Sequence, residues 1–219
     1  GESVADKKVI IKNVIGIENA ILDSGAIVTC NHFNPYDSFS VEKSMRDAGI
    51  LKKRKLYKVI REGNYTNFPG FFGFIFKHCN TLPLSSVKET MKKFLKACEE
   101  LLSMGNYILI YPEQSMWWNY RKPKPLKPGA FSIAVKNQVP VLPVFITMED
   151  SETIGDDGYP IQEYTIHFEK PIYPDSTKTN KENENIMMEK NYEVWKKIYE
   201  DFYKTPLVYL NEMDGNEEK

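Results

Sequence analysis

The feature that most constrains the fold is the alternation of short, uninterrupted apolar runs with stretches of helical periodicity. Tyr107–Tyr111 (Y-I-L-I-Y) is apolar throughout, which is typical of a strand covered on both faces in a parallel sheet. Ala26–Cys30 (A-I-V-T-C) is a second short apolar strand. Helices are expected at Ser38–Ala48, Ser86–Met104 and Gly129–Lys136. This order predicts an α/β fold, with a central, mostly parallel sheet covered by helices.

The remaining elements follow from the same patterns. They are expected as strands at Val9–Val14, Leu56–Ile60, Val139–Ile146 and Glu163–Glu169, and as a helix at Asn185–Tyr203. Pro140 and Pro143 are expected to break the third of these strands. Glu163–Glu169 alternates apolar and polar residues and is predicted to be an edge strand, with His167 on its polar side.

Length and composition bound the class of protein. A chain of 219 residues suits one α/β domain, placed at residues 1–210 and followed by a polar tail at 211–219 that is expected to be disordered. The net charge of −1 gives no indication of nucleic-acid binding. The three cysteines lack metal-ligand spacing, and their odd number argues against a disulfide framework, so we expect no metal and a reducing, cytoplasmic compartment.

An aromatic segment and a basic cluster are the sequence features that indicate membrane contact. No apolar run is long enough to span a bilayer, but Phe68–Phe76 (F-P-G-F-F-G-F-I-F) is unusually aromatic. It is either part of the core or an exposed surface for an acyl chain or a membrane. The basic cluster Lys52–Lys55 is expected to help docking on an anionic bilayer. The sequence begins at Gly1 without a methionine, and a trimmed N-terminal anchor stays an open alternative.

A histidine and a carboxylate share the loop that follows the first apolar strand. His32 and Asp37 are separated by four residues, between the strand Ala26–Cys30 and the helix that follows. In a loop, this spacing lets the carboxylate bind one imidazole nitrogen and leaves the other free to take a proton from a substrate hydroxyl. The alternative is that Asp37 only caps the helix and that His32 is an ordinary hydrogen-bonded loop residue.

A second carboxylate is expected near this pair. Glu113 follows the strand Tyr107–Tyr111, as His32 follows the strand Ala26–Cys30. In open parallel sheets, ligands bind beyond the carboxyl ends of the strands. The sequence therefore predicts that both side chains lie at the same edge of the sheet.

Four blocks between Gly16 and Ile146 resemble the glycerolipid acyltransferases, the family of lysophosphatidate (1-acylglycerol-3-phosphate) acyltransferases. The lead-in G-I-E-N-A-I-L-D-S-G-A-I-V-T-C-N-H ends in the family's histidine, four residues and aspartate, here His32 and Asp37. Y-P-E-Q at Tyr111–Gln114 resembles the family's F-P-E-G block. L-K-P-G-A at Leu126–Ala130 and V-P-V-L-P-V at Val139–Val144 resemble the last two blocks.

The resemblance implies an O-acyltransferase that uses an acyl thioester, on coenzyme A or acyl carrier protein, and needs no resident cofactor. His32 is then the general base on a lipid hydroxyl, and Asp37 orients and supports it. Glu113, Gln114 and Ser115 are expected to bind substrate. The protein is expected to lie at the cytoplasmic face of the membrane as a peripheral protein.

The departures from the family concern the acceptor. Ser86 occupies the position of an arginine that binds the acceptor phosphate, and Gln114-Ser115-Met116 stands where the family continues Gly-Thr-Arg. Neither replacement supplies the charge of a guanidinium. Charge from Arg61, Arg121 or Lys127 is the candidate replacement. The neutral groups, followed by aromatic residues, predict a lysolipid, glycolipid or other hydroxylated acceptor in preference to glycerol-3-phosphate or lysophosphatidate.

Two other classes of function remain open. The first is a lipid-binding protein or scaffold that keeps the fold without turnover, which the missing arginines favour. The second is a hydrolase with Ser38 or Ser115 as nucleophile. Neither serine lies in a G-x-S-x-G motif, which ranks the hydrolase last.

Overall fold

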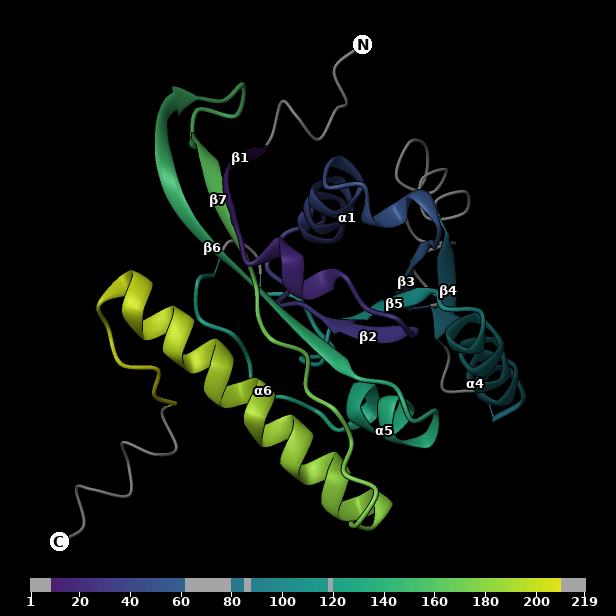
Figure 1. Cartoon of the computed structure of the whole chain (residues 1–219). Helices are drawn as coiled ribbons and strands as arrows, with labels where there is room; N and C mark the ends of the chain where they lie inside the picture. The colour runs from purple at the N-terminus through teal and green to yellow at the C-terminus, as the bar shows by residue number, and fades with distance from the viewer. Residues whose placement is uncertain (1–8, 62–79, 85–87, 118–119, 210–219) are drawn as a thin grey trace, which may run out of the picture.

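The computed structural model describes residues 9–61, 80–84, 88–117 and 120–209 (Figure 1). Within this part of the chain, seven strands form one sheet in the order β1-β7-β6-β2-β5-β3-β4. The strands are β1 Val9–Ile15, β2 Ala26–Thr29, β3 Leu56–Arg61, β4 Thr81–Leu84, β5 Tyr107–Ile110, β6 Val141–Ile154 and β7 Pro160–Phe168. The helices are η2 Ile17–Ala20, α1 Asp37–Asp47, η3 Ile50–Lys52, α4 Lys88–Ser103, α5 Gly129–Lys136 and α6 Asn180–Tyr203.

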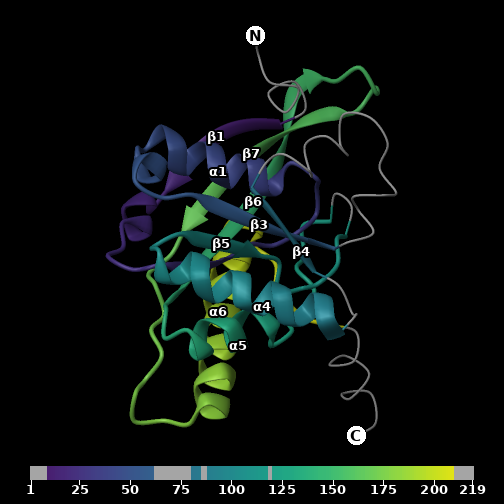
Figure 2. The same cartoon turned by 90° about the vertical axis from the view of Figure 1, so that its right-hand side faces the viewer.

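The sheet is mostly parallel and its centre is covered on both faces, as the sequence predicts. Strand β2 pairs in parallel with β5 on one side and with β6 on the other, and β6 with β7 is the antiparallel pair among the described strands. Helix α1 covers one face, whereas α4, α5 and α6 lie on the other (Figures 1 and 2). Val28 packs in the core beneath α1 and Ile27 in the core beneath α4 and α5, so alternate residues of β2 are buried on opposite faces. Burial on both faces is why the run is apolar without interruption.

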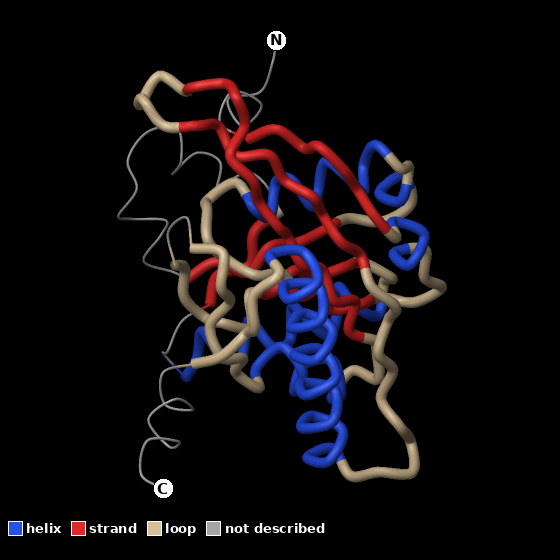
Figure 3. The backbone as a smooth tube through the Cα atoms, turned by 90° about the vertical axis from the view of Figure 1, so that its left-hand side faces the viewer, coloured by secondary structure: helices blue, strands red, loops and turns tan. Residues whose placement is uncertain are grey.

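Two expectations about the C-terminal strands are wrong. Strand β6 is not broken at Pro143 but continues to Ile154 and extends with β7 as a long hairpin (Figure 3). Pro143 lies one residue before the β6–β7 ladder, which begins at the pair Val144 and Phe168. Pro143 pairs in parallel with Thr29 of β2, but the N–H that proline lacks would point to the other side, beyond the end of β7, where the Pro143 carbonyl accepts the Glu169 N–H at 2.9 Å.

Strand β7 is an internal strand, because β1 pairs with its outer side in parallel. The pairing joins segments at opposite ends of the chain, which no local pattern reveals. His167 is consequently half-buried, with Nε2 3.0 Å from the Thr147 Oγ1, and burial lowers its pKa to about 4. It lies outside the group of residues around His32.

The last helix begins earlier than expected. Helix α6 begins at Asn180, because Thr179 and Glu182 form a capping box in which each side chain accepts the other's backbone N–H. Trp195 of α6 is fully buried against Phe145 of β6, with ring centroids 5.4 Å apart. None of the described helices combines the length and apolar character needed to cross a bilayer. Phe68–Phe76 lies outside the described residues.

Candidate active site

The loop after β2 and the loop after β5 meet because their strands are neighbours in register. Thr29 at the end of β2 pairs with Ile110 at the end of β5. The next residues therefore leave the sheet side by side, and the backbone N–H of His32 donates to Glu113 Oε1 at 2.7 Å. The structure thus brings His32 and Glu113 together at one edge of the sheet, as the sequence predicts.

Asp37 is fully buried and binds the loop that carries the histidine. Its Oδ2 lies 3.1 Å from His32 Nδ1 and accepts the backbone N–H of Phe33 at 2.8 Å and of Asn34 at 2.9 Å. The hydroxyl of Tyr164 on β7 donates to Oδ1 at 3.4 Å. The N-cap residue of α1 is Tyr36, and Asp37 is the first residue of the helix. The Asp37 carboxylate therefore does not cap the helix but orients the histidine loop. Burial raises the pKa of Asp37, whereas these hydrogen bonds lower it.

The imidazole of His32 is held in a defined orientation. A proton on Nδ1 is donated to Asp37, which leaves Nε2 as the nitrogen that can accept a proton. The ring stacks on Tyr111 with centroids 3.8 Å apart and planes 15° apart. Its side chain is 21% exposed, whereas that of Asp37 is 0% exposed, so a substrate can reach the histidine but not the carboxylate. This is the arrangement of a general base with an orienting carboxylate.

Glu113 joins two loops through their backbones. Only 3% of this residue is exposed; Oε1 accepts the N–H of His32 and Oε2 accepts that of Lys124, both at 2.7 Å. Burial raises the pKa of Glu113 to about 8 despite these two hydrogen bonds. The contacts make it a positioning residue for the histidine loop, and its contact with substrate stays a prediction.

The pKa of Glu113 predicts a pH dependence of stability. The folded protein holds the proton up to about pH 8, whereas the unfolded chain releases it near 4.5, so the free energy of unfolding falls as pH rises between these values. One such group contributes a slope of at most about 1.4 kcal/mol per pH unit. Urea unfolding from pH 5 to 8 should show a shallower slope for Glu113→Gln than for the wild type. Equal slopes would contradict this assignment.

The other site residues predicted from the sequence differ in their contacts with the loop after β5. Ser115 is exposed; its Oγ accepts a hydrogen bond from Lys124 Nζ at 2.7 Å and donates to the carbonyl of Glu113 at 3.4 Å. Gln114 is exposed and has a φ of 57°, in the left-handed region that favours glycine, which is the residue of the F-P-E-G block at this position. The N–H of Lys127 donates to the Pro112 carbonyl at 2.8 Å, and its side chain is exposed. Ser86 and the side chain of Arg61 lie outside the described residues.

The contacts of the two candidate serines give no support to a hydrolase. Ser38 is buried and hydrogen-bonded to Tyr111. Among the described residues, no serine forms a hydrogen bond with His32, as a serine nucleophile activated by histidine requires. In the same described ranges, no group of three or more His, Cys, Asp and Glu side chains is arranged to hold a metal ion.

Sequence reasoning missed Asn31, which extends the pairing of β2 with β6 through its side chain. Asn31 is 1% exposed; its Nδ2 donates to the Ile146 carbonyl at 2.9 Å and its Oδ1 accepts the Ile146 N–H at 2.7 Å. The signal was an amide directly before the histidine, at the end of a buried strand. Tyr111 and Tyr164 were missed as partners of His32 and Asp37, because only the register of β5 and β7 reveals their positions.

The loss of Asn31 is expected to lower stability. Asn31→Ala leaves the buried N–H and carbonyl of Ile146 without their partner, and each unpaired group costs about 1–3 kcal/mol. We expect the free energy of unfolding, measured by urea titration, to fall by about 2–4 kcal/mol. Asn137→Ala removes one half-buried contact at the end of α5 and serves as the control, with a smaller loss. Equal losses in the two variants would argue against the role given to Asn31.

Fold and site together define an α/β protein with a hydrogen-bonded histidine–aspartate pair at the carboxyl ends of parallel strands. A family model described as Acyltransferase matches residues 12–147, more than half of the chain, and the protein belongs to this family. The 1-acyl-sn-glycerophosphate (LPA) acyltransferase PlsC from Thermotoga maritima has a similar structure, with a TM-score of 0.52 and 21% sequence identity. The match covers 87% of this chain and 73% of that chain and concerns the fold. No curated protein sequence matches the chain.

Proposed function

We propose that the protein is an O-acyltransferase that moves an acyl group from a thioester to the hydroxyl of a lipid, with His32 as the general base. The observation that carries the proposal is the geometry of the pair, in which buried Asp37 binds Nδ1 and the accessible imidazole keeps Nε2 for the acceptor. Membership of the Acyltransferase family supports acyl transfer as the reaction.

In the proposed reaction, Nε2 of His32 takes the proton of the acceptor hydroxyl as the hydroxyl oxygen attacks the thioester carbonyl. The resulting imidazolium is stabilised by Asp37. The carbon–sulfur bond then breaks, and the leaving thiolate receives the proton from the imidazolium. The products are an ester and a free thiol, and the histidine returns to its initial state. The thioester comes from acyl-coenzyme A or acyl carrier protein, and no resident cofactor takes part.

The proposed acceptor is a lysolipid, glycolipid or other hydroxylated lipid. Gln114 and Ser115 offer neutral polar groups beside the site. Trp117 follows them in the chain, and its backbone N–H donates to the His32 carbonyl at 3.1 Å. A phosphate monoester would lack the guanidinium groups that usually bind it. Lys124 of this loop places its ammonium 4.8 Å from the centroid of the Trp117 ring.

Peripheral contact with the cytoplasmic face of a membrane belongs to the same proposal. Of the basic cluster Lys52–Lys55, three lysines are exposed, whereas the guanidinium of Arg54 donates to the carbonyls of Leu22 and Ser24 and lies 4.5 Å from the Tyr107 ring centroid. Arg54 thus holds a turn in place, and the three lysines are the part of the cluster available to a lipid surface.

Charge reversal tests this membrane contact. Each basic residue near an anionic surface contributes about 1 kcal/mol, so reversing Lys52, Lys53 and Lys55 to glutamate should weaken vesicle binding strongly at low salt. Co-sedimentation with vesicles that contain phosphatidylserine measures the effect. The matched control reverses three exposed lysines of α4, Lys92, Lys93 and Lys96. Equal binding by the two triple variants would remove the electrostatic contribution assigned to this cluster.

The experiment that tests the proposed function follows the free thiol released from acyl-coenzyme A, with and without hydroxylated acceptors. Acceptor-dependent release, with the acyl group recovered as an ester of the acceptor, supports transfer. Release without acceptor indicates hydrolysis. If no thiol is released from acyl-coenzyme A or from acylated acyl carrier protein, the protein binds lipid without turnover.

A further inference from the structure

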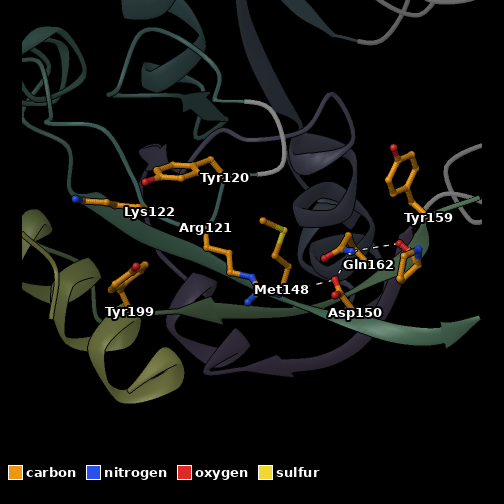
Figure 4. Close-up of a pocket in the computed structure, with 9 residues that line it drawn as sticks. Tyr120, Arg121, Lys122, Met148, Asp150, Tyr159, Gln162 and Tyr199 are labelled. Atoms are coloured by element: carbon orange, nitrogen blue, oxygen red, sulfur yellow. Dashed lines mark hydrogen bonds and ion pairs between the residues drawn. The ribbon is translucent and has the colours of Figure 1, made fainter. Parts of the chain in front are cut away.

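A hollow of about 510 Å³ lies next to the catalytic pair, and the proposed chemistry does not use it. Its walls come from the loop after Glu113, from β6 and β7, and from α6 (Figure 4). The residues that line it are Tyr120, Arg121, Lys122, Met148, Asp150, Tyr159, Pro160, Gln162 and Tyr199. Its volume lies within the usual range of about 300–1,000 Å³ for small-ligand sites.

Two chains of contacts connect this hollow to the catalytic pair. Along the sheet, Tyr164 bonds to Asp37 and pairs with Met148, and the next pair on the same face, Asp150 and Gln162, is about 7 Å further along the strands. Along the loop, the Trp117 N–H donates to the His32 carbonyl, and the Trp117 ring contacts that of Tyr120 with centroids 5.0 Å apart. The hollow is therefore linked to His32 through Trp117 and Tyr120, and to Asp37 through Tyr164 and Met148.

Charges of opposite sign come to the wall of the hollow from different segments of the chain. Lys122 and Arg121 come from the loop, whereas Asp150, with Gln162 and Tyr159, comes from the hairpin of β6 and β7 (Figure 4). Arg121 and Asp150 are 3.8 Å apart, a long ion pair between side chains that are 47% and 62% exposed. Gln162 Nε2 donates to Asp150 Oδ1 at 2.8 Å, which fixes the carboxylate in the wall of the hollow.

The aromatic residues complete this pattern. Tyr159 is 72% exposed and Tyr120 50% exposed, so both rings are accessible to a ligand. Aromatic faces beside a carboxylate suit an alkylammonium group, and a guanidinium suits a phosphate. A phosphate monoester alone would meet the repulsion of Asp150, and a neutral sugar would supply no charge to complement either member of the long Arg121–Asp150 ion pair.

We propose that this hollow binds the headgroup of a zwitterionic lysophospholipid acceptor, with its phosphate diester at Arg121 and its ammonium group at Asp150 and Tyr159. The proposal deepens the proposed function, on which it rests, by naming the acceptor class. It also places the positive charge for the acceptor phosphate in the loop after Glu113, at positions other than those of the two arginines that the chain lacks.

The test measures binding separately from turnover. Glycerophosphocholine, the soluble headgroup, is titrated calorimetrically into His32→Ala protein and into the same protein carrying Asp150→Asn or Arg121→Gln. Each second substitution should weaken binding about tenfold. Glu149→Gln, which removes a neighbouring carboxylate on the opposite face of β6, should leave the affinity unchanged. Circular dichroism verifies that each variant is folded.

The result that overturns the proposal is tighter binding of glycerol-3-phosphate or of a glycosylglycerol than of glycerophosphocholine, or unchanged affinity in Asp150→Asn. A failure of the proposed function is distinguishable, because it leaves these affinities intact while no acceptor supports thiol release. In the active protein, Asp150→Asn should raise KM for lysophosphatidylcholine with little change in kcat. For lysophosphatidate the same substitution should lower KM, because a repulsive charge is removed.

Discussion

Replacing His32 with alanine is expected to lower kcat/KM for acyl transfer by about 10²–10⁴-fold, the usual contribution of a general base. The backbone contacts of residue 32, with Glu113 and Trp117, remain in the variant, because they involve only its N–H and carbonyl. The imidazole is partly exposed, so its loss leaves no buried polar group except the acceptor on Asp37. The free energy of unfolding should therefore change much less than the activity. Thiol release and urea unfolding measure the two quantities.

The matched control for this variant is His167→Gln. His167 is also half-buried, but it lies on β7 beside Thr147 and contributes no contact to the site. Its replacement should change kcat/KM by less than a few-fold. If His32→Ala kept wild-type turnover, or if both variants lost activity equally, the mechanism proposed for His32 would be wrong.

Asp37→Asn is expected to lower kcat by about 10²–10⁴-fold while preserving the shape of the loop. The amide oxygen of asparagine can still accept the N–H groups of Phe33 and Asn34. His32 Nδ1 shares this same oxygen, Oδ2, so the amide oxygen can also accept its proton, while the amide nitrogen takes the place of Oδ1 beside the Tyr164 hydroxyl. The activity falls because the imidazolium that forms during the reaction loses its counter-charge.

Stability separates this effect from a simple loss of folding. Because burial raises the pKa of Asp37, an uncharged side chain of the same size should be tolerated by the fold. Asp47→Asn, at the exposed end of the same helix, is the control and should leave both activity and stability close to those of the wild type. The account fails here if Asp37→Asn retains most of the activity, or if its activity falls only in proportion to the folded fraction.

The centre of the sheet could be predicted from the sequence because local burial decides it. Ala26–Thr29 and Tyr107–Ile110 are buried on both faces, and such strands are apolar at nearly every position. The hairpin of β6 and β7 could not be predicted in the same way. Its strand β7 is paired with β1, and Pro143 can lie within β6 because β7 ends at Phe168. These are non-local pairings, and a pattern along one segment does not contain them.

The candidate site shows the same division. The spacing of His32 and Asp37, and the position of Glu113 after a parallel strand, were sufficient to predict that the three lie together. The stacking of Tyr111 on His32, the bond from Tyr164 to Asp37 and the bridge made by Asn31 depend on strand register. The hollow beside them combines three segments that are far apart in the chain, so no sequence motif marks it.

The most direct test of the central claim is the fate of the acyl group when the reaction runs in water labelled with ¹⁸O. Acyl-coenzyme A and a panel of hydroxylated lipid acceptors are incubated with the protein, and mass spectrometry identifies the products and their ¹⁸O content. If the acceptor hydroxyl, deprotonated by His32, is the nucleophile, the acyl group appears as an unlabelled ester of the acceptor, in an amount equal to the free thiol. Recovery of the acyl group as free fatty acid that carries ¹⁸O would contradict the account, because water would then be the nucleophile.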